Sequence, residues 1–163
     1  MAEFFHENFN TKETPEELVE IWHNKAYDAY KNTVKAKKGA KKLLSHLKDN
    51  NVKTAIVTSN SHELIEAGLK NNGLYDYIDL VITADSLNTN KDTPYIFQET
   101  ARRLDVEPEY IIVFDDLYPV IKAVNDANMR SVAVYDKRSI KAYGEELIRE
   151  TADYYIKDFT EVL

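Results

Sequence analysis

The 163-residue chain is long enough for one domain with a hydrophobic core, and its 44% hydrophobic and 30% charged residues are ordinary for a globular protein. Its formal net charge of −7 argues against non-specific binding to nucleic acid, and no apolar run approaches the roughly 18 to 20 residues of a membrane-spanning helix. The chain has no cysteine for disulfides or thiolate zinc sites and no secretory signal at its start, so we expect a cytoplasmic protein.

The first 36 residues are predicted to be helical only. Thr14, Pro15 and Glu17 combine an N-cap, a proline at the first helical position and a glutamate at the third. They predict a helix that runs to about Asn32, because apolar residues recur along it at helical spacing. We expect residues 1–36 to form a small helical segment and residues 37–163 to form the main domain.

The rest of the chain alternates between helices and short strands. A helix is expected over about residues 39–50, and its solvated face is expected to carry five basic side chains, Lys35, Lys37, Lys38, Lys41 and Lys42. The predicted strands are residues 53–58, 79–83, 111–114, 131–135 and 153–156, and the predicted helices are 60–72, 93–104, 117–127 and 139–150. This alternation predicts an α/β fold, a parallel sheet with helices on both faces.

Polar residues stand where three of the predicted strands end. Thr58, Ser59 and Asn60 follow the first strand, Lys91 lies in the loop after the second, and Asp115 and Asp116 follow the third. In doubly wound sheets, ligands bind beyond the carboxyl ends of the strands. Hydroxyls and free N–H groups at a helix start suit a phosphate, and paired carboxylates suit a hard cation such as Mg²⁺. The sequence therefore predicts a site for phosphate and metal.

Each of these groups also has a purely structural interpretation. The segment from Thr58 to Asn60 is suited to capping the next helix, as are the two aspartates at 115 and 116. Lys91 in a polar loop is typical of a solvated side chain. We favour the site because all the groups fall at the same edge of the predicted sheet.

Five segments, in chain order, resemble the core of haloacid dehalogenase (HAD) superfamily hydrolases, close to the β-phosphoglucomutase and phosphoglycolate phosphatase branch. They are residues 39–44 (GAKKLL), 54–60 (TAIVTSN), 90–97 (NKDTPYIF), 113–116 (VFDD, with Ala123 and Met129 downstream) and 153–159 (DYYIKDF). The resemblance implies a HAD-like, Rossmann-like three-layer α/β/α fold preceded by a partial helical cap. It also implies a Mg²⁺-dependent phosphatase or phosphomutase of small phosphorylated metabolites.

The same resemblance implies a role for each candidate residue. Thr58 would hydrogen-bond the transferring phosphoryl group, together with the backbone N–H groups of the next two residues. Lys91 would balance negative charge beside the phosphate. Asp116 would bind Mg²⁺ directly, and Asp115 would bind it directly or through water. Phosphoryl transfer depends mainly on positioning and charge neutralisation, so these roles are chemically coherent.

The family's first motif, an Asp-x-Asp whose first carboxylate attacks phosphorus, is not found upstream of residue 52. The resemblance therefore implies a chain that begins inside the cap. We expect a fragment, or a gene model started at an internal methionine, with little or no turnover of its own.

In the family, the strand that carries the Asp-x-Asp lies between the strands ending here at Thr58 and Phe114. Without it, those two strands pair directly, a displaced or swapped segment fills the gap, or the gene product is longer, and we favour the last. A sheet edge exposed by such a gap would favour a homodimer.

Three other interpretations compete with this one. A degenerate, non-catalytic domain that binds a phosphorylated ligand or a protein partner is suggested by Tyr95, Leu117 and Val120, which depart from the family pattern. A phosphoacceptor receiver domain is disfavoured, because its acidic pair precedes its threonine and lysine in the chain. A histidine metal site is also disfavoured, since ligand-like spacing is absent among His6, His23, His46 and His62.

Overall fold

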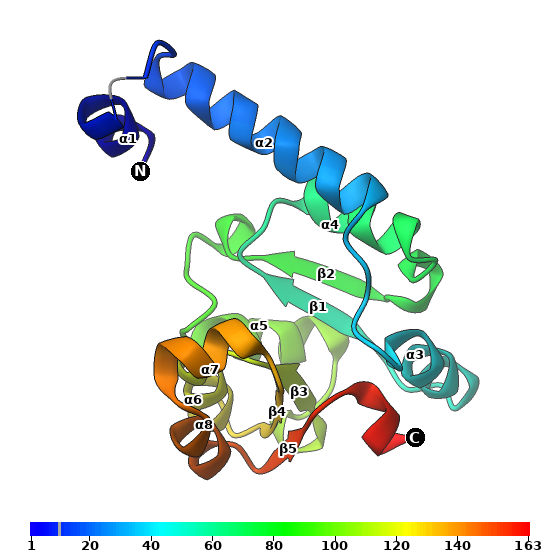
Figure 1. The fold of residues 1–163 in the computed structure, drawn as a ribbon. Coiled ribbons are helices and arrows are strands. Elements are labelled where there is room, and N and C mark those ends of the chain that lie inside the picture. The colour runs from blue at the N-terminus through cyan, green and yellow to red at the C-terminus, as the bar shows by residue number, and fades with distance from the viewer. Residues whose placement is uncertain (10) are drawn as a thin grey trace.

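The computed structural model describes residues 1–9 and 11–163, and Figure 1 shows parallel strands with helices packed beside them. The helices are α1 (Ala2–Phe9), α2 (Pro15–Asn32), α3 (Ala40–Asp49), α4 (His62–Asn71), α5 (Pro94–Leu104), α6 (Tyr118–Asp126), α7 (Lys137–Tyr143) and α8 (Glu145–Thr151). The strands are β1 (Ala55–Thr58), β2 (Leu80–Thr83), β3 (Ile112–Asp115), β4 (Arg130–Val134) and β5 (Tyr154–Ile156). Short 3₁₀ turns are η1 (Tyr75–Tyr77), η2 (Asp85–Leu87), η3 (Pro108–Tyr110) and η4 (Phe159–Val162). The predicted α/β class is confirmed.

The strands form two separate sheets where the sequence predicts one. β1 pairs in parallel with β2, so that Thr58 lies opposite Thr83, and β3, β4 and β5 form the second parallel sheet. Direct pairing of the strands that end at Thr58 and Phe114 is therefore wrong, and no strand of the described residues fills the gap between them. One edge of β1 and one edge of β3 consequently lack a strand partner for their N–H and C=O groups. The third arrangement, a longer gene product, stays a prediction.

One apolar cluster joins the two sheets through helices α5 and α6. Ile82 of β2, Phe97 of α5 and Val124 of α6 are at most 1% exposed and belong to this cluster. Val57 of β1 and Val113 of β3 pack against it from the two sheets. Full burial of such a side chain contributes about 1.5–3 kcal/mol. In the described chain no backbone pairing joins the sheets, so these helices supply the apolar contacts between them.

Helix α2 begins and ends where the sequence predicts, because its first turn contains a complete capping box. The Thr14 hydroxyl accepts the N–H of Glu17 at 3.2 Å, and the Glu17 carboxylate accepts the N–H of Thr14 at 2.8 Å. The helix packs against α4 (Figure 1). There the ring of Tyr30 lies so close to Gly68 that a Cβ on Gly68 would come within 2.8 Å of it. Although α2 has 18 residues, no helix of the described chain is long and apolar enough to cross a membrane.

The helix predicted over residues 139–150 is two helices, and that prediction is wrong. Gly144 separates α7 from α8 and has a φ of +87°, a value that the interior of a right-handed helix does not contain. The chain therefore turns between the two helices before it enters β5.

The basic run is helical only in its second part. Lys41 and Lys42 lie on α3, but Lys35, Lys37 and Lys38 lie in the exposed, non-helical segment that joins α2 to α3. The interpretation of all five lysines as one helix face is therefore wrong. Lys37 and Lys38 instead form ion pairs with aspartates from the C-terminal part of the chain.

An aspartate just before β2 and another just before β5 complete the pairing of the neighbouring strands. The Asp79 carboxylate accepts the N–H of Thr54 at 2.7 Å, and the Asp153 carboxylate accepts the N–H of Ser131 at 2.8 Å. The Ser131 hydroxyl in turn accepts the N–H of Asp153 at 3.1 Å. Thr54 and Ser131 are both buried, so these carboxylates satisfy donors that water does not reach.

Asp153→Ala is expected to lower the free energy of unfolding by about 1–3 kcal/mol, because it leaves the buried N–H of Ser131 without an acceptor. Urea denaturation at neutral pH measures the change. Asp126→Ala is the matched control, since Asp126 forms an exposed ion pair with Lys122. That control should change stability by less than about 0.5 kcal/mol, and equal losses in the two variants would contradict the prediction.

Candidate phosphate and metal site

The predicted site residues lie at the carboxyl ends of strands in both sheets. Thr58 is the last residue of β1 and Asp115 is the last residue of β3, and both are buried. Asp116 follows directly, and Lys91 lies in the loop between β2 and α5. The parallel strands therefore bring hydroxyl, ammonium and carboxylate groups to the same end of the fold.

The structure brings Lys91 and Asp115 into direct contact. The Lys91 ammonium donates to one carboxylate oxygen of Asp115, and the two side chains are only 23% and 6% exposed. The other Asp115 oxygen accepts the N–H groups of Asp116 and Leu117, at 2.9 and 3.0 Å. Asp115 thus orders the turn before α6 as well as binding Lys91, although its side chain does not cap that helix. The ion pair links the loop after β2 with the end of β3.

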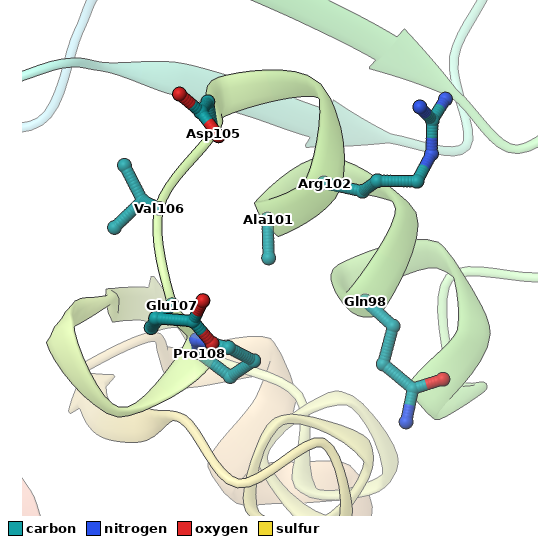
Figure 2. A pocket seen from close by; sticks show the side chains of 7 residues that line it. All are labelled: Gln98, Ala101, Arg102, Asp105, Val106, Glu107 and Pro108. Carbon is teal, nitrogen blue, oxygen red and sulfur yellow. The ribbon is translucent and has the colours of Figure 1, made fainter.

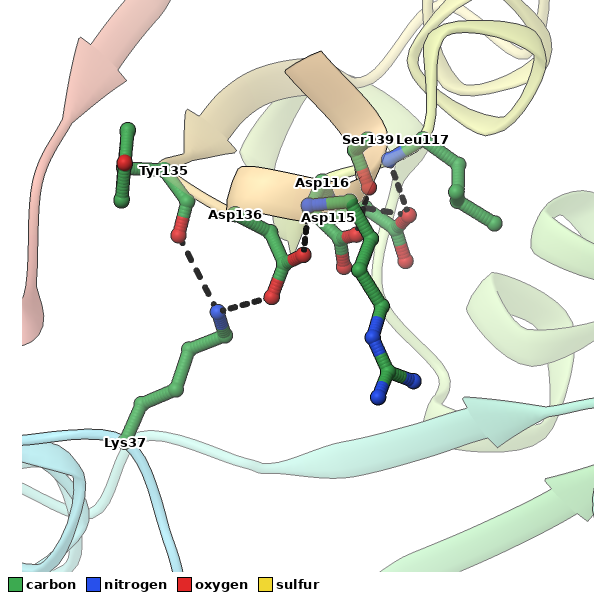
Figure 3. A network of polar contacts seen from close by, with 8 residues as sticks. Lys37, Asp115, Asp116, Leu117, Tyr135, Asp136 and Ser139 are labelled. Carbon is green, nitrogen blue, oxygen red and sulfur yellow. Dashed lines mark hydrogen bonds and ion pairs between the residues drawn. The ribbon is translucent and has the colours of Figure 1, made fainter. Parts of the chain in front are cut away.

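Asp116 points toward helix α7. One of its carboxylate oxygens accepts a hydrogen bond from the hydroxyl of Ser139, which is 3% exposed (Figure 3). The described residues place no donor within hydrogen-bond distance of the other oxygen, Oδ1. Asp116 therefore keeps one carboxylate oxygen available to a ligand. The residue pattern does not predict the Ser139 contact, because it indicates a single long helix with this serine at its start.

Asp136, two residues after β4, extends the polar network around α7 (Figure 3). Its carboxylate accepts the backbone N–H of Arg138 at 2.9 Å and the ammonium of Lys37 at 3.1 Å. The Arg138 hydrogen bond, followed by the Lys37 ammonium, lowers the pKa of Asp136. The stabilisation by this carboxylate is therefore present above the ordinary aspartate pKa of about 3.9 and is lost as the pH falls through the lower folded value.

The loop after β1 has a different local structure from the one predicted. Helix α4 begins at His62, and its N-cap is Ser61, whose hydroxyl accepts the N–H of Leu64 at 3.4 Å. The interpretation of the segment from Thr58 to Asn60 as this cap is therefore wrong. The Thr58 hydroxyl instead accepts the N–H of Asn60 at 3.0 Å, and Ser59 and Asn60 are exposed.

Asn60 also contacts α2, a contact that the residue pattern does not predict. Its side-chain amide donates to the Tyr30 hydroxyl at 2.9 Å. The helical periodicity of α2 placed Tyr30 on the inward face, but gave no sign of its partner. In the described chain no hydrogen bond joins Thr58 to Lys91 or to Asp115, so Thr58 is not linked directly to the Lys91–Asp115 pair.

The side chains at this end of the fold suit Mg²⁺ together with a phosphate. Mg²⁺ is usually held by one or two carboxylates, with water and phosphate oxygens completing its octahedron. The free oxygen of Asp116 supplies such a ligand, whereas both oxygens of Asp115 already accept protein donors. Across residues 1–9 and 11–163, no group of three or more histidine, cysteine or acidic side chains is arranged to enclose a metal. The ion would therefore need oxygens of water or phosphate in addition to the oxygens of the protein.

A hollow on the surface lies away from these residues. It measures about 310 Å³ and lies beside the turn that joins α5 to β3, where Arg102, Asp105 and Pro108 are among its lining residues (Figure 2). That turn precedes β3, so the hollow is at the amino end of the strand, whereas Asp115 is at its carboxyl end. The hollow and the candidate site are therefore separate features.

Comparison with known proteins supports the resemblance found in the sequence. The family profile described as haloacid dehalogenase-like hydrolase matches residues 1–134. A curated relative, validoxylamine A 7'-phosphate phosphatase of Streptomyces hygroscopicus subsp. limoneus, is 32% identical over 124 residues, which is 76% of this chain and 55% of that protein. The chain thus spans little more than half the length of this relative.

Solved structures show the same fold. β-Phosphoglucomutase from Clostridium difficile matches with a TM-score of 0.73 and 25% identity, over 99% of this chain and 69% of that one. CbbY from Rhodobacter sphaeroides, solved in complex with phosphate, matches with a TM-score of 0.79 and 18% identity, over 93% of this chain and 67% of that one. The CbbY likeness concerns the fold alone.

Proposed function

The chain belongs to the haloacid dehalogenase-like hydrolase family, and from this we propose that it carries the phosphate-binding and Mg²⁺-binding part of a phosphatase or phosphomutase. The substrates are small phosphorylated metabolites, and the protein acts in the cytoplasm. Residues 1–36 form part of a helical cap, and residues 37–163 form the core domain. The observation that carries the proposal is the Lys91–Asp115 pair beside Asp116, at the carboxyl end of β3, which lies at the same end of the fold as Thr58 at the carboxyl end of β1.

Each proposed role follows from the chemistry of the side chain. The Thr58 hydroxyl and the backbone N–H groups of Ser59 and Asn60 donate to oxygens of the phosphoryl group. In the described structure the Asn60 N–H also lies 3.0 Å from the Thr58 hydroxyl. The Lys91 ammonium balances the negative charge that gathers there, and its contact with Asp115 holds it at this edge. Asp116 is the direct Mg²⁺ ligand, and Asp115 is the second or water-mediated one. Mg²⁺ held there would neutralise phosphoryl charge.

These 163 residues alone are proposed to have little or no turnover. No Asp-x-Asp sequence follows a strand in the chain, so no carboxylate stands in the position of the family's nucleophile. The unpaired edges of β1 and β3 are consistent with this, since the family's nucleophile strand lies between the corresponding strands.

Binding of Mg²⁺ and inorganic phosphate tests the proposal directly. At about ten times its Kd, a ligand adds about 1.4 kcal/mol to the free energy of unfolding, which corresponds to a rise in Tm of roughly 3–6 °C for a chain of this size. Asp116→Ala is expected to abolish the part of the shift that depends on Mg²⁺. Asp126→Ala, an exposed aspartate on α6, should retain the full shift.

Hydrolysis of an aryl phosphate with Mg²⁺ is the companion measurement. We expect no turnover above the rate without protein. Turnover that survives Asp116→Ala, or a wild-type Tm that neither Mg²⁺ nor phosphate changes, would contradict the assignment.

A further inference from the structure

Ser139 is a buried hydroxyl whose side-chain acceptor is the carboxylate of Asp116 (Figure 3). It lies in the first turn of α7, 23 residues from Asp116 in sequence. A hydroxyl donor to one carboxylate oxygen fixes the rotation of the carboxylate, and so fixes the direction in which its other oxygen points. In the described structure that other oxygen is the one without a protein donor.

The first turn of α7 is itself held from two sides. Asp136 is the N-cap of this helix, because its carboxylate accepts the N–H of Arg138. The Lys37 ammonium reaches the same place, where it donates to Asp136 and to the carbonyl of Tyr135, each at 3.1 Å (Figure 3). Lys37 therefore ties the segment between α2 and α3 to the turn that carries Ser139.

That segment is also anchored to α4. The Val34 carbonyl accepts the side-chain amides of Asn71 and Asn72, at 3.1 and 3.0 Å. The Asn72 side chain in turn accepts the N–H of Ala36 at 2.9 Å. Lys37 thus comes from a segment that is already fixed, so its contact with Asp136 can restrain the turn at the start of α7.

We propose that Ser139 is a positioning residue that orients the carboxylate of Asp116 for Mg²⁺, and that Lys37 holds the turn bearing Ser139 in place. The proposal rests on the proposed function, in which Asp116 is the direct Mg²⁺ ligand. Partners that orient a metal ligand by hydrogen bonding typically change metal affinity 10- to 100-fold when they are removed. Because Asp116 retains its own carboxylate, loss of Ser139 should weaken Mg²⁺ binding without abolishing it.

Ser139→Ala is expected to raise the Kd for Mg²⁺ about tenfold, measured by isothermal titration calorimetry in the presence of inorganic phosphate. Ser139→Thr keeps the hydroxyl and should restore most of the affinity, which a merely structural role would not require. Thermal unfolding of each variant without metal separates loss of folding from loss of binding.

Lys37→Met provides a second variant that leaves Ser139 and Asp116 intact. It is expected to raise the Kd for Mg²⁺ about two- to threefold. The effect is smaller than that of Ser139→Ala because the Asp136 cap of α7 and the Ser139 hydrogen bond both remain. Lys38→Met is the matched control, since Lys38 is the adjacent lysine but pairs with Asp158. The control should leave the Kd unchanged.

The outcomes separate this proposal from the one it rests on. Wild-type affinity in Ser139→Ala, with binding lost in Asp116→Ala, would overturn the positioning role and leave the proposed function intact. Equal effects of Lys37→Met and Lys38→Met would overturn the role of Lys37. A wild-type chain that binds no Mg²⁺ would overturn the proposed function, and the positioning role with it.

Discussion

Lys91→Met is expected to lower the free energy of unfolding by about 2–4 kcal/mol. The substitution keeps an extended side chain but leaves the Asp115 carboxylate, 6% exposed, without a charged partner among the described side chains. Breaking a buried ion pair on one side typically costs about 3–5 kcal/mol. The loss should be somewhat smaller here, because the N–H groups of Asp116 and Leu117 still donate to Asp115. Urea denaturation at neutral pH measures it.

The matched variants for this experiment change the charge at one site at a time. Lys42→Met removes an exposed lysine of α3 and should alter stability by less than about 0.5 kcal/mol. Adding Asp115→Asn to Lys91→Met removes the unpaired buried charge and should recover at least part of the stability. A double variant less stable than Lys91→Met would show that the unpaired charge is not the cause of the loss.

Phe97→Ala is expected to destabilise the chain by about 3–5 kcal/mol. Phe97 is 1% exposed and lies in the apolar cluster that joins the two sheets. Truncation removes its buried area and leaves a cavity that a packed core closes only in part. Because the sheets share no backbone pairing in the part of the chain that the structure describes, we also expect the amides of β1 and β2 to lose hydrogen-exchange protection before those of β4.

Phe97→Leu is the conservative control and should cost less than about 1.5 kcal/mol, because it keeps most of the apolar volume. Hydrogen exchange resolved by residue distinguishes a local effect from a global one. A uniform loss of protection in both sheets would show that the two sheets unfold as one cooperative unit. It would contradict the expectation that the β1–β2 sheet opens first when its packing against α5 is weakened.

These two positions show how the chain connects its two sheets. Lys91 makes the connection at the polar edge, where it reaches from the loop after β2 to the end of β3. Phe97, six residues later on α5, makes it in the apolar interior. The segment that supplies the candidate phosphate-binding lysine is therefore also the segment that holds the fold together.

Local features could be predicted from the sequence because their causes are local. The capping box of Thr14 and Glu17 fixes the start of α2, and short apolar runs identify each strand to within about two residues. The placement of Thr58 and Asp115 at strand ends follows from the same runs. Gly144 is the exception: its positive φ divides a helix, but a single glycine within a helical pattern does not by itself reveal which conformation it adopts.

Contacts between distant segments were decided by the tertiary structure alone. Ser139 and Asp116 are 23 residues apart, and Lys37 and Asp136 are 99 apart. Their meeting depends on how the crossover helices return the chain to the strand ends, which periodicity does not encode. The division into two sheets has the same origin, since strands that are far apart in the sequence pair with one another. The residues of one strand do not show which other strand lies beside it. Which chemical groups stand at the strand ends could therefore be predicted from the residues alone, whereas the contacts among those groups depend on how the elements pack.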